Sequence, residues 1–226
     1  NTGVTFTNGT SASSMDKIAL SFANAGSYEG KLVVENCNGK DSIVKSVNVY
    51  DAPKADSCNT TTTNINNNAG VGIYAPYDKI TEAQLESMFK IHINAPFFLT
   101  QKLASLLNNG GGIVNISSGL ARFTMSGHSA YATMKGGIET LTKYQANFFG
   151  ERKIRVNVVA PGAIETDFGG GVVRDNEELN NYIATTTALG RVGLPNDIGS
   201  VVAFLCTDDA KWVNAQRLEV SGGINF

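Results

Sequence analysis

A tyrosine and a lysine four residues apart are the pair in this sequence best suited to proton transfer. Tyr131 and Lys135 open an apolar-periodic stretch that continues to Phe148, and their spacing puts both side chains on one face of a helix. A phenol has a pKa near 10 and works poorly as an acid or base at pH 7 unless its anion is stabilised. Shifting that pKa by about three units takes about 4 kcal/mol, which one ammonium about 4 Å away supplies at an effective dielectric constant of ~20.

A serine completes the candidate proton-transfer group. Ser118 ends the strand-like run from Gly111, so its hydroxyl is expected beside the phenol of Tyr131. Together the three side chains could polarise a carbonyl or deprotonate an alcohol. A tyrosine and lysine at this spacing also occur by chance on helix surfaces, and paired serines are ordinary turn residues. The interpretation therefore depends on the motifs that surround them.

The surrounding motifs resemble the short-chain dehydrogenase/reductase family, in its compact single-domain branch. The serine stands thirteen positions before the tyrosine, as in that family, and the resemblance runs from about Asn67 to Phe226. Four ordered motifs at family spacing are far more specific than any one alone. The motifs that carry the resemblance are Asn67–Gly70, Ser118, Tyr131–Lys135 and Ile154–Gly162, with Gly190–Pro195 and Glu219–Gly223 in support.

The resemblance implies an oxidoreductase that uses NADP or NAD, with NADP slightly preferred, to interconvert a carbonyl and a secondary alcohol by hydride transfer. Tyr131 would be the acid/base, Lys135 would lower its pKa and hold the nicotinamide ribose, and Ser118 would hydrogen-bond the substrate oxygen. The implied cofactor-binding residues also include Gly9, Ser11, Ser13, Met15, Asn48, Val49, Asn68, Ala69, Gly70, Pro161, Gly162, Ile164 and Thr166.

The opening residues depart from the family's glycine-rich phosphate loop, in which bare backbone lets a pyrophosphate approach a helix N-terminus. With 17–26 as the first helix, Gly9 matches the first glycine, but Ser13 and Met15 occupy the second and third positions. Met15 adds bulk where the phosphate should approach. Hydroxyls such as that of Ser11 could donate to phosphate instead.

The next strands also fit the family poorly. Residues 31–35 and 43–49 read as the second and third strands, but about seven residues separate them, and a parallel crossover needs roughly 10–12. Either segments are absent here or this half of the chain has diverged and binds cofactor weakly. Glu35 would favour NAD, whereas Lys17 could contact the 2′-phosphate of NADP or lie in solvent.

From about residue 63, strands alternate with helices, which predicts an α/β fold with a three-layer, doubly wound parallel sheet (Rossmann-like). With 226 residues, we expect a single domain over 1–226. Helices are expected to begin near Thr81, which has capping-box spacing to Gln84, and at Pro195, with Pro96 bending or restarting the first. Residues 168–188 are expected to form a mobile substrate lid.

Two histidines lie near the candidate site. His92 stands where the family usually carries an active-site asparagine, with Asn94 two residues further on. A histidine can relay protons at neutral pH, so His92 is a candidate for that role through water; packing at a helix bend is the alternative. His128 is better read as a helix-start residue or a pocket wall than as a catalyst.

Composition and charge exclude several classes of protein. A net charge of −2 without a basic block gives no basis for binding nucleic acid or an anionic membrane. No apolar run approaches a membrane span, and no export signal or metal motif is visible. Three cysteines without metal-ligand spacing indicate a reducing, cytoplasmic setting.

The resemblance also implies a homotetramer, for which the helix 129–149 could serve, and a small carbonyl or alcohol substrate. The main rival interpretation is a non-catalytic member of the fold with a degraded phosphate loop. A third is an epimerase or dehydratase that retains bound NAD.

Overall fold

The computed structural model describes the backbone of residues 4–6, 20–22, 26–36, 39–49 and 64–225, and the side chains of residues 64–225. The chain divides into two compact units, Asn1–Ser57 and Cys58–Phe226, and each is described by itself. A single domain over 1–226 therefore stays a prediction.

Among the described residues of the first unit there are two antiparallel strand pairs. Strands β1 (Val4–Phe6) and β2 (Leu20–Phe22) pair with each other. Strands β3 (Gly26–Asn36) and β4 (Gly39–Val49) form the second pair, with every residue from one end to the other in register.

These pairs correct two predictions. The first helix, expected at 17–26, is replaced at Leu20–Phe22 by a strand, which suits the alternation of large apolar residues around Ser21. The strands expected at 31–35 and 43–49 are not parallel but belong to β3 and β4, which run antiparallel. The short connection explains this, because an antiparallel pair needs only a tight turn, whereas a parallel pair needs a long crossover.

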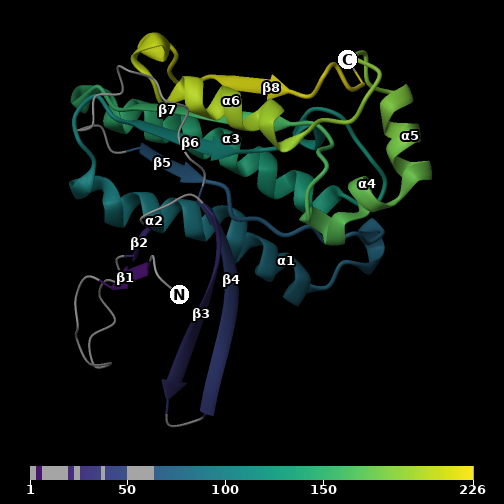
Figure 1. Ribbon diagram of the computed structural model, residues 1–226, viewed down its shortest axis with the longest axis horizontal. Helices are drawn as coiled ribbons and strands as arrows, with labels where there is room; N and C mark the ends of the chain where they lie inside the picture. The colour runs from purple at the N-terminus through teal and green to yellow at the C-terminus, as the bar shows by residue number, and fades with distance from the viewer. Residues whose placement is uncertain (1–3, 7–19, 23–25, 37–38, 50–63, 226) are drawn as a thin grey trace. The chain divides into compact units, whose positions relative to one another are not determined.

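The second unit is built on a four-stranded parallel sheet in the order β5-β6-β7-β8 (Figure 1). The strands are β5 (Asn64–Asn67), β6 (Gly112–Ile116), β7 (Arg155–Pro161) and β8 (Arg217–Val220). The central strands β6 and β7 are almost wholly buried, as expected for parallel strands covered on both faces.

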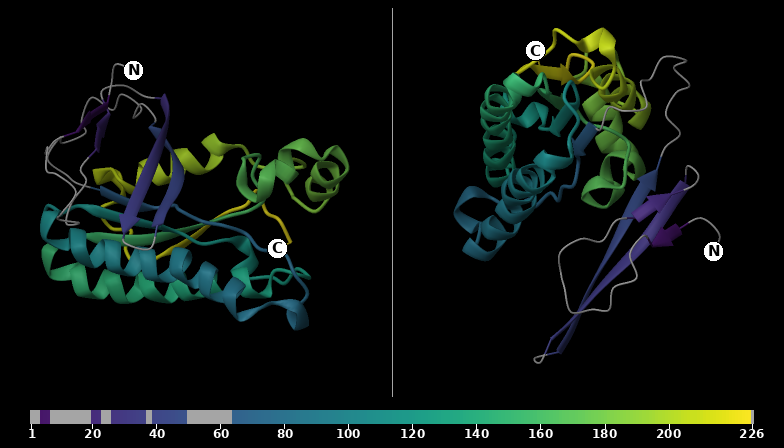
Figure 2. Two further views of the ribbon diagram at one scale, coloured as in Figure 1. Left: turned by 90° about the horizontal axis from the view of Figure 1, so that it is seen from below. Right: turned by 90° about the vertical axis from the view of Figure 1, so that its left-hand side faces the viewer.

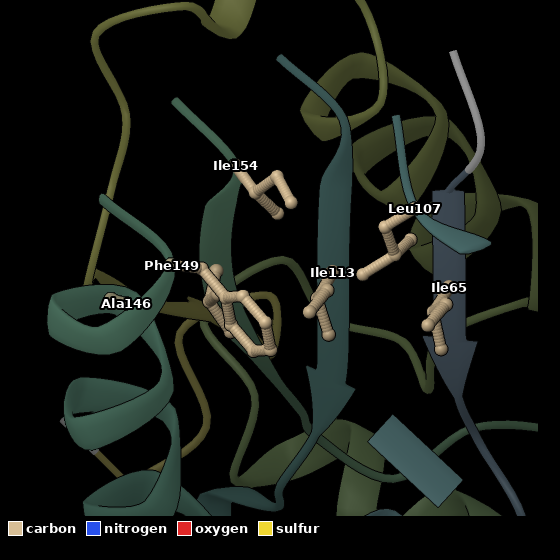
Figure 3. Close-up of a cluster of buried hydrophobic side chains, with 7 residues drawn as sticks. Ile65, Leu107, Ile113, Ala146, Phe149 and Ile154 are labelled. Carbon is tan, nitrogen blue, oxygen red and sulfur yellow. The ribbon is translucent and has the colours of Figure 1, made fainter. Parts of the chain in front are cut away.

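Helices cover both faces of this sheet (Figures 1 and 2). One apolar cluster joins Ile113 to Ala146 and Phe149 of α3 (Ser129–Phe149) (Figure 3). Leu103 of α2 (Ala95–Leu103) packs against this cluster. The next residue of the same strand, Val114, packs on the other side with Leu205 of α6 (Pro195–Leu205). Because successive strand residues face opposite ways, this confirms the predicted three-layer α/β architecture.

The segment before β6 is a helix interrupted by one turn of π-helix. Helix α1 (Glu82–Phe89) begins with the predicted capping box, in which the Gln84 amide donates to Thr81 Oγ1 at 3.3 Å. The π-turn occupies Lys90–Asn94 and leads into α2. Pro96 explains it, since a proline offers no N–H to the carbonyl four residues earlier and its ring crowds that carbonyl. That carbonyl belongs to His92.

Helix α3 has the predicted bounds, but its buried face differs in part from the predicted apolar stretch. Tyr131, Met134 and Ile138 are buried, whereas Tyr144 and Phe148 are 75% and 76% exposed. The buried face continues through polar and small residues (Thr142, Gln145, Ala146) to Phe149. None of the helices in the described part of the chain is long and apolar enough to cross a membrane.

The remaining α-helices of the described residues lie between β7 and α6. A 3₁₀ turn at Phe168–Gly171 leads to α4 (Val172–Asp175) and α5 (Glu177–Thr185). These elements occupy the segment expected to be the substrate lid. Thr187 then bridges Ile224 near the end of the chain, which ties the segment back to the sheet. Its mobility stays a prediction.

Candidate active site

The carboxyl ends of three neighbouring strands bring the candidate site residues to one edge of the sheet. β5 ends at Asn67, β6 at Ile116 and β7 at Pro161, and all three run parallel. Asn68–Gly70, Ser118 and Gly162 follow these ends. In open parallel sheets the ligand crevice lies outside this edge. Asn68, Ala69 and Gly70 are exposed there.

A buried network of amides and hydroxyls fixes β5 and β6 beneath this edge. Asn67 Nδ2 donates to Asn115 Oδ1 at 2.7 Å and to Thr100 Oγ1 at 3.3 Å. Asn115 Nδ2 donates to Thr142 and Gln145 of α3 at 2.9 and 3.0 Å. This network was not predicted from the sequence, where its only signal is Asn115, an asparagine inside a strand that reads as buried.

Lys135 is held in place by the end of strand β6. Its Nζ donates to the Ile116 carbonyl at 2.8 Å and lies 5.5 Å from the centroid of the Tyr131 ring. The Lys135 carbonyl accepts a hydrogen bond from Ser117 Oγ at 3.0 Å. The ammonium of Lys135 therefore lies beside the Tyr131 ring, as the spacing of four residues on one helix predicts.

Burial sets the pKa values of this pair in opposite directions. It raises the pKa of Tyr131 to about 12, against the opposing effect of a hydrogen bond with Ser118. It lowers the pKa of Lys135 to about 8. The pKa of the phenol is therefore raised and not lowered toward 7, contrary to the expectation from the charge of Lys135 alone. Desolvation penalises the charged form of each group.

Ser118 is oriented by the turn that follows β6. Its Oγ accepts a hydrogen bond from the Leu120 amide at 3.2 Å and caps the 3₁₀ turn Gly119–Ala121. The same Oγ shares a hydrogen bond with Tyr131. The structure thus brings together all three members of the predicted proton-transfer group.

His92 lies in the π-turn, directly against Tyr131. It is 2% exposed, and its ring meets that of Tyr131 edge to face with centroids 5.4 Å apart. Nε2 lies 2.7 Å from the Val71 carbonyl and 3.3 Å from the Val71 amide nitrogen, and we assign the proton to Nε2 because the contact with the carbonyl is the shorter. Nδ1 is buried without a hydrogen-bond partner among the described residues. Burial is the main cause that lowers the pKa of His92, and the nearby charge of Lys135 adds to it, so the ring is neutral at pH 7.

A charged network supports the turn behind Ser118. Glu139 of α3 accepts from both Ser117 Oγ and Arg217 Nε at 2.7 Å. Arg217 also bonds Glu219 at 2.8 Å, and Arg122 bonds the same carboxylate through two nitrogens at 2.7 Å. The bonds from Arg122 are the main cause that lowers the pKa of Glu219 to about 2. These residues were not predicted from the sequence, because their pairing joins segments far apart in the chain.

The segment after β7 returns to the tyrosine through Phe168. The centroid of the Phe168 ring lies 5.8 Å from the centroid of the Tyr131 ring. A Cβ built on Gly72 would lie 3.1 Å from Phe168 Cζ, so this ring also covers the loop after β5. The Phe168 amide donates to Thr166 Oγ1 at 3.2 Å.

Two other predicted cofactor residues, Gly162 and Ile164, lie in the same segment after β7. The Gly162 amide donates to the Val220 carbonyl at 3.1 Å. A Cβ there would lie 2.9 Å from Ser221 Cα, so only glycine fits without displacement. Ile164 forms a parallel bridge with Gly193.

Six predicted cofactor residues are not placed at this edge by the structure. Gly9, Ser11, Ser13 and Met15 lie outside the described residues. Asn48 and Val49 end strand β4 of the antiparallel pair in the other unit, so the strand end that they were expected to provide in the parallel sheet is not formed.

A comparison with models of protein families matches the part of the chain that contains the parallel sheet and the residues at its strand ends. The family model described as "Enoyl-(Acyl carrier protein) reductase" matches residues 60–225, well over half of the chain. The chain belongs to the short-chain dehydrogenase/reductase family. The match includes every residue of the second unit that has been placed at the strand ends.

Known proteins of this family that resemble the chain are reductases and an oxidoreductase. It is 36% identical to an uncharacterised oxidoreductase of Methylorubrum extorquens over 70% of this chain and 64% of that one. It is 32% identical to the trihydroxynaphthalene reductase PfmaI of Pestalotiopsis fici over 91% and 79%. The solved structure of the angucycline C-6 ketoreductase LanV with bound NADP shares 33% identity at a TM-score of 0.66, over 71% and 61%. The chain thus spans less than two thirds of the length of some of these relatives.

Proposed function

We propose that this protein is an NAD(P)(H)-dependent reductase that interconverts a carbonyl and a secondary alcohol, with Tyr131 as the proton donor and acceptor. The observation that carries the proposal is that the part-exposed Ser118 lies with the buried Tyr131 and Lys135 at the carboxyl edge of the sheet. NADP is the preferred cofactor in this proposal, since the ketoreductase LanV was solved with bound NADP.

In the reduction direction, Tyr131 gives its proton to the substrate oxygen. A pKa raised to about 12 by burial keeps the phenol protonated at neutral pH, which is the form a general acid needs. The hydroxyl of Ser118 orients the substrate oxygen beside the phenol. As the phenolate forms, the ammonium of Lys135 stabilises it, because a charge aimed at the developing anion lowers the barrier.

The residues at the strand ends fit the nicotinamide half of a dinucleotide. The exposed stretch Asn68–Gly70 ends in the small residues Ala69 and Gly70, which let a flat ligand approach the backbone closely. Gly162 follows the end of β7 at the same edge. Lys135, Ile164 and Thr166 complete this set, with Lys135 holding the ribose. When bound, the nicotinamide would give or accept the hydride.

His92 is proposed to relay protons to this cluster through water. Its Nε2–H is committed to the Val71 carbonyl, so the buried Nδ1 is an acceptor that faces the site without a protein partner among the described residues. Replacing His92 by Leu should slow turnover and change the shape of its pH profile. If His92→Leu changes only stability, the histidine is a packing residue.

The outer face of α3 is proposed to form the interface of a homotetramer. Tyr144 and Phe148 leave large apolar surfaces on that face. Mass measured by light scattering on the wild type and Phe148→Glu tests this. A wild type that is monomeric at micromolar concentration contradicts it.

The reductase proposal is tested with Tyr131→Phe, using the exposed Tyr144→Phe on the same helix as the matched control. Removing the Tyr131 hydroxyl should lower kcat for reduction of a ketone about 10²- to 10⁴-fold, while NADPH binding, followed by nicotinamide fluorescence, is retained. Tyr144→Phe should match the wild type. If the wild type binds neither NADPH nor NADH at millimolar concentration, the fold is used for non-catalytic binding and the proposal fails.

A further inference from the structure

Phe168 is, with the buried His92, one of the aromatic side chains that contact the Tyr131 ring among the described residues. Its ring lies tilted by 50° to the Tyr131 ring at 5.8 Å, and it rests on the loop after β5, where Cβ atoms built on Gly70 and Gly72 would lie 3.9 and 3.1 Å from it. Despite these contacts Phe168 remains 46% exposed. One part of the ring is therefore packed in the site while another part is available to a ligand.

The chain around Phe168 specifies this position. The Phe168 amide bonds Thr166 Oγ1, and the three glycines that follow it all have φ between 64° and 79°, a region that side chains rarely adopt. Arg174 closes the turn by bonding Asp167 at 2.6 Å and Asp175 at 2.7 Å. A ring placed by this many local constraints can act as a wall of the site.

We propose that Phe168 is a specificity-determining residue that selects flat aromatic ketones by stacking on their rings. The proposal rests on the reductase function above. In this proposal, the substituents of a carbonyl bound through its oxygen to Ser118 and Tyr131 lie beside the Phe168 ring, whose centroid is 5.8 Å from that of Tyr131. An aromatic substituent gains an offset or edge-to-face contact there, which an aliphatic ring of the same size does not make.

Turnover of two matched ketones tests the proposal. The probes are 2-tetralone, which carries a fused benzene ring, and 2-decalone, its saturated counterpart. In the wild type kcat/KM should favour the aromatic ketone, and Phe168→Leu should lower the ratio of the two kcat/KM values about 2- to 13-fold, the range expected for one aromatic contact. Phe204→Leu, which changes a 42% exposed phenylalanine on α6, is the matched control and should keep the wild-type ratio.

Each other outcome has a separate meaning. An unchanged ratio in a folded Phe168→Leu that still binds NADPH overturns this inference and leaves the reductase function standing. Equal losses with both ketones together with weaker NADPH binding also overturn it, because Phe168 would then act on the cofactor. No turnover of any ketone by the wild type overturns the proposed function, and the inference with it. Rescue of the ratio by Phe168→Tyr, which restores an aromatic ring, supports it.

Discussion

Replacing Lys135 by Met tests whether its ammonium activates Tyr131. The charge lies 5.5 Å from the centroid of the ring over which a phenolate spreads its charge. At an effective dielectric constant of ~20 that separation is worth about 3 kcal/mol, or roughly a 100-fold change in rate. We therefore expect Lys135→Met to lower kcat for ketone reduction about 100-fold at pH 7 under saturating cofactor.

The pH profile makes the same test sharper. Burial lowers the pKa of Lys135 to about 8 and raises that of Tyr131 to about 12, so between these values the phenol keeps its proton while the lysine loses its charge. The wild-type rate of reduction should fall as pH rises through about 8. Lys135→Met should show no such decline, because it has no charge to lose.

The assay is the disappearance of NADPH absorbance from pH 6 to 10, with Lys143→Met as a control that removes an exposed lysine from the same helix. Lys143→Met should follow the wild type throughout. A Lys135→Met protein within threefold of the wild-type rate, or a wild-type rate that is flat from pH 7 to 9, would refute the reasoning.

Three further predictions concern stability, measured by urea unfolding. Asn115→Ala should lower the free energy of unfolding by roughly 2–5 kcal/mol, because it leaves several buried polar groups without a hydrogen-bond partner. Asn147→Ala, which changes an exposed residue, should lower it little. Equal losses in the two variants would contradict a stabilising role of the network. Gly162→Ala should destabilise the protein by about 1–3 kcal/mol, because the new Cβ would lie 2.9 Å from the backbone after β8. Gly199→Ala, whose Cβ would point into open space on α6, should stabilise it by about 0.5–1 kcal/mol. A change of the same sign in both variants would contradict this prediction. On unfolding, the pKa of Lys135 rises from about 8 to its ordinary value of 10.5, so the unfolded chain binds more protons than the folded chain between these pH values. The free energy of unfolding should therefore rise with pH in this range, by up to about 3 kcal/mol. Lys135→Met should lack that rise, and an identical slope in both proteins would exclude this lysine as its source.

The sequence predicted best the features that depend on neighbours within one or two turns. The capping box at Thr81, the start of α6 at Pro195 and the bounds of α3 all follow from hydrogen bonds and backbone restrictions between residues a few positions apart. The pairing of Tyr131 with Lys135 belongs to the same class, since a helix fixes which residues share a face.

The sequence also held information that the family resemblance overrode. About seven residues between the strands that became β3 and β4 are too few for a parallel crossover. Local chain length therefore indicated the antiparallel pair that the structure contains, whereas the family pattern predicted parallel strands.

The sequence by itself determined which groups could carry proton transfer and which local elements hold them. Only the tertiary structure decided their chemistry. Burial reverses the expected pKa shift of Tyr131, Asn115 finds its partners on two other elements, β5 and α3, and Phe168 reaches the phenol from a distant segment. The physical reason is that desolvation and long-range hydrogen bonding depend on every segment that packs around a group, and spacing along the chain does not record those neighbours.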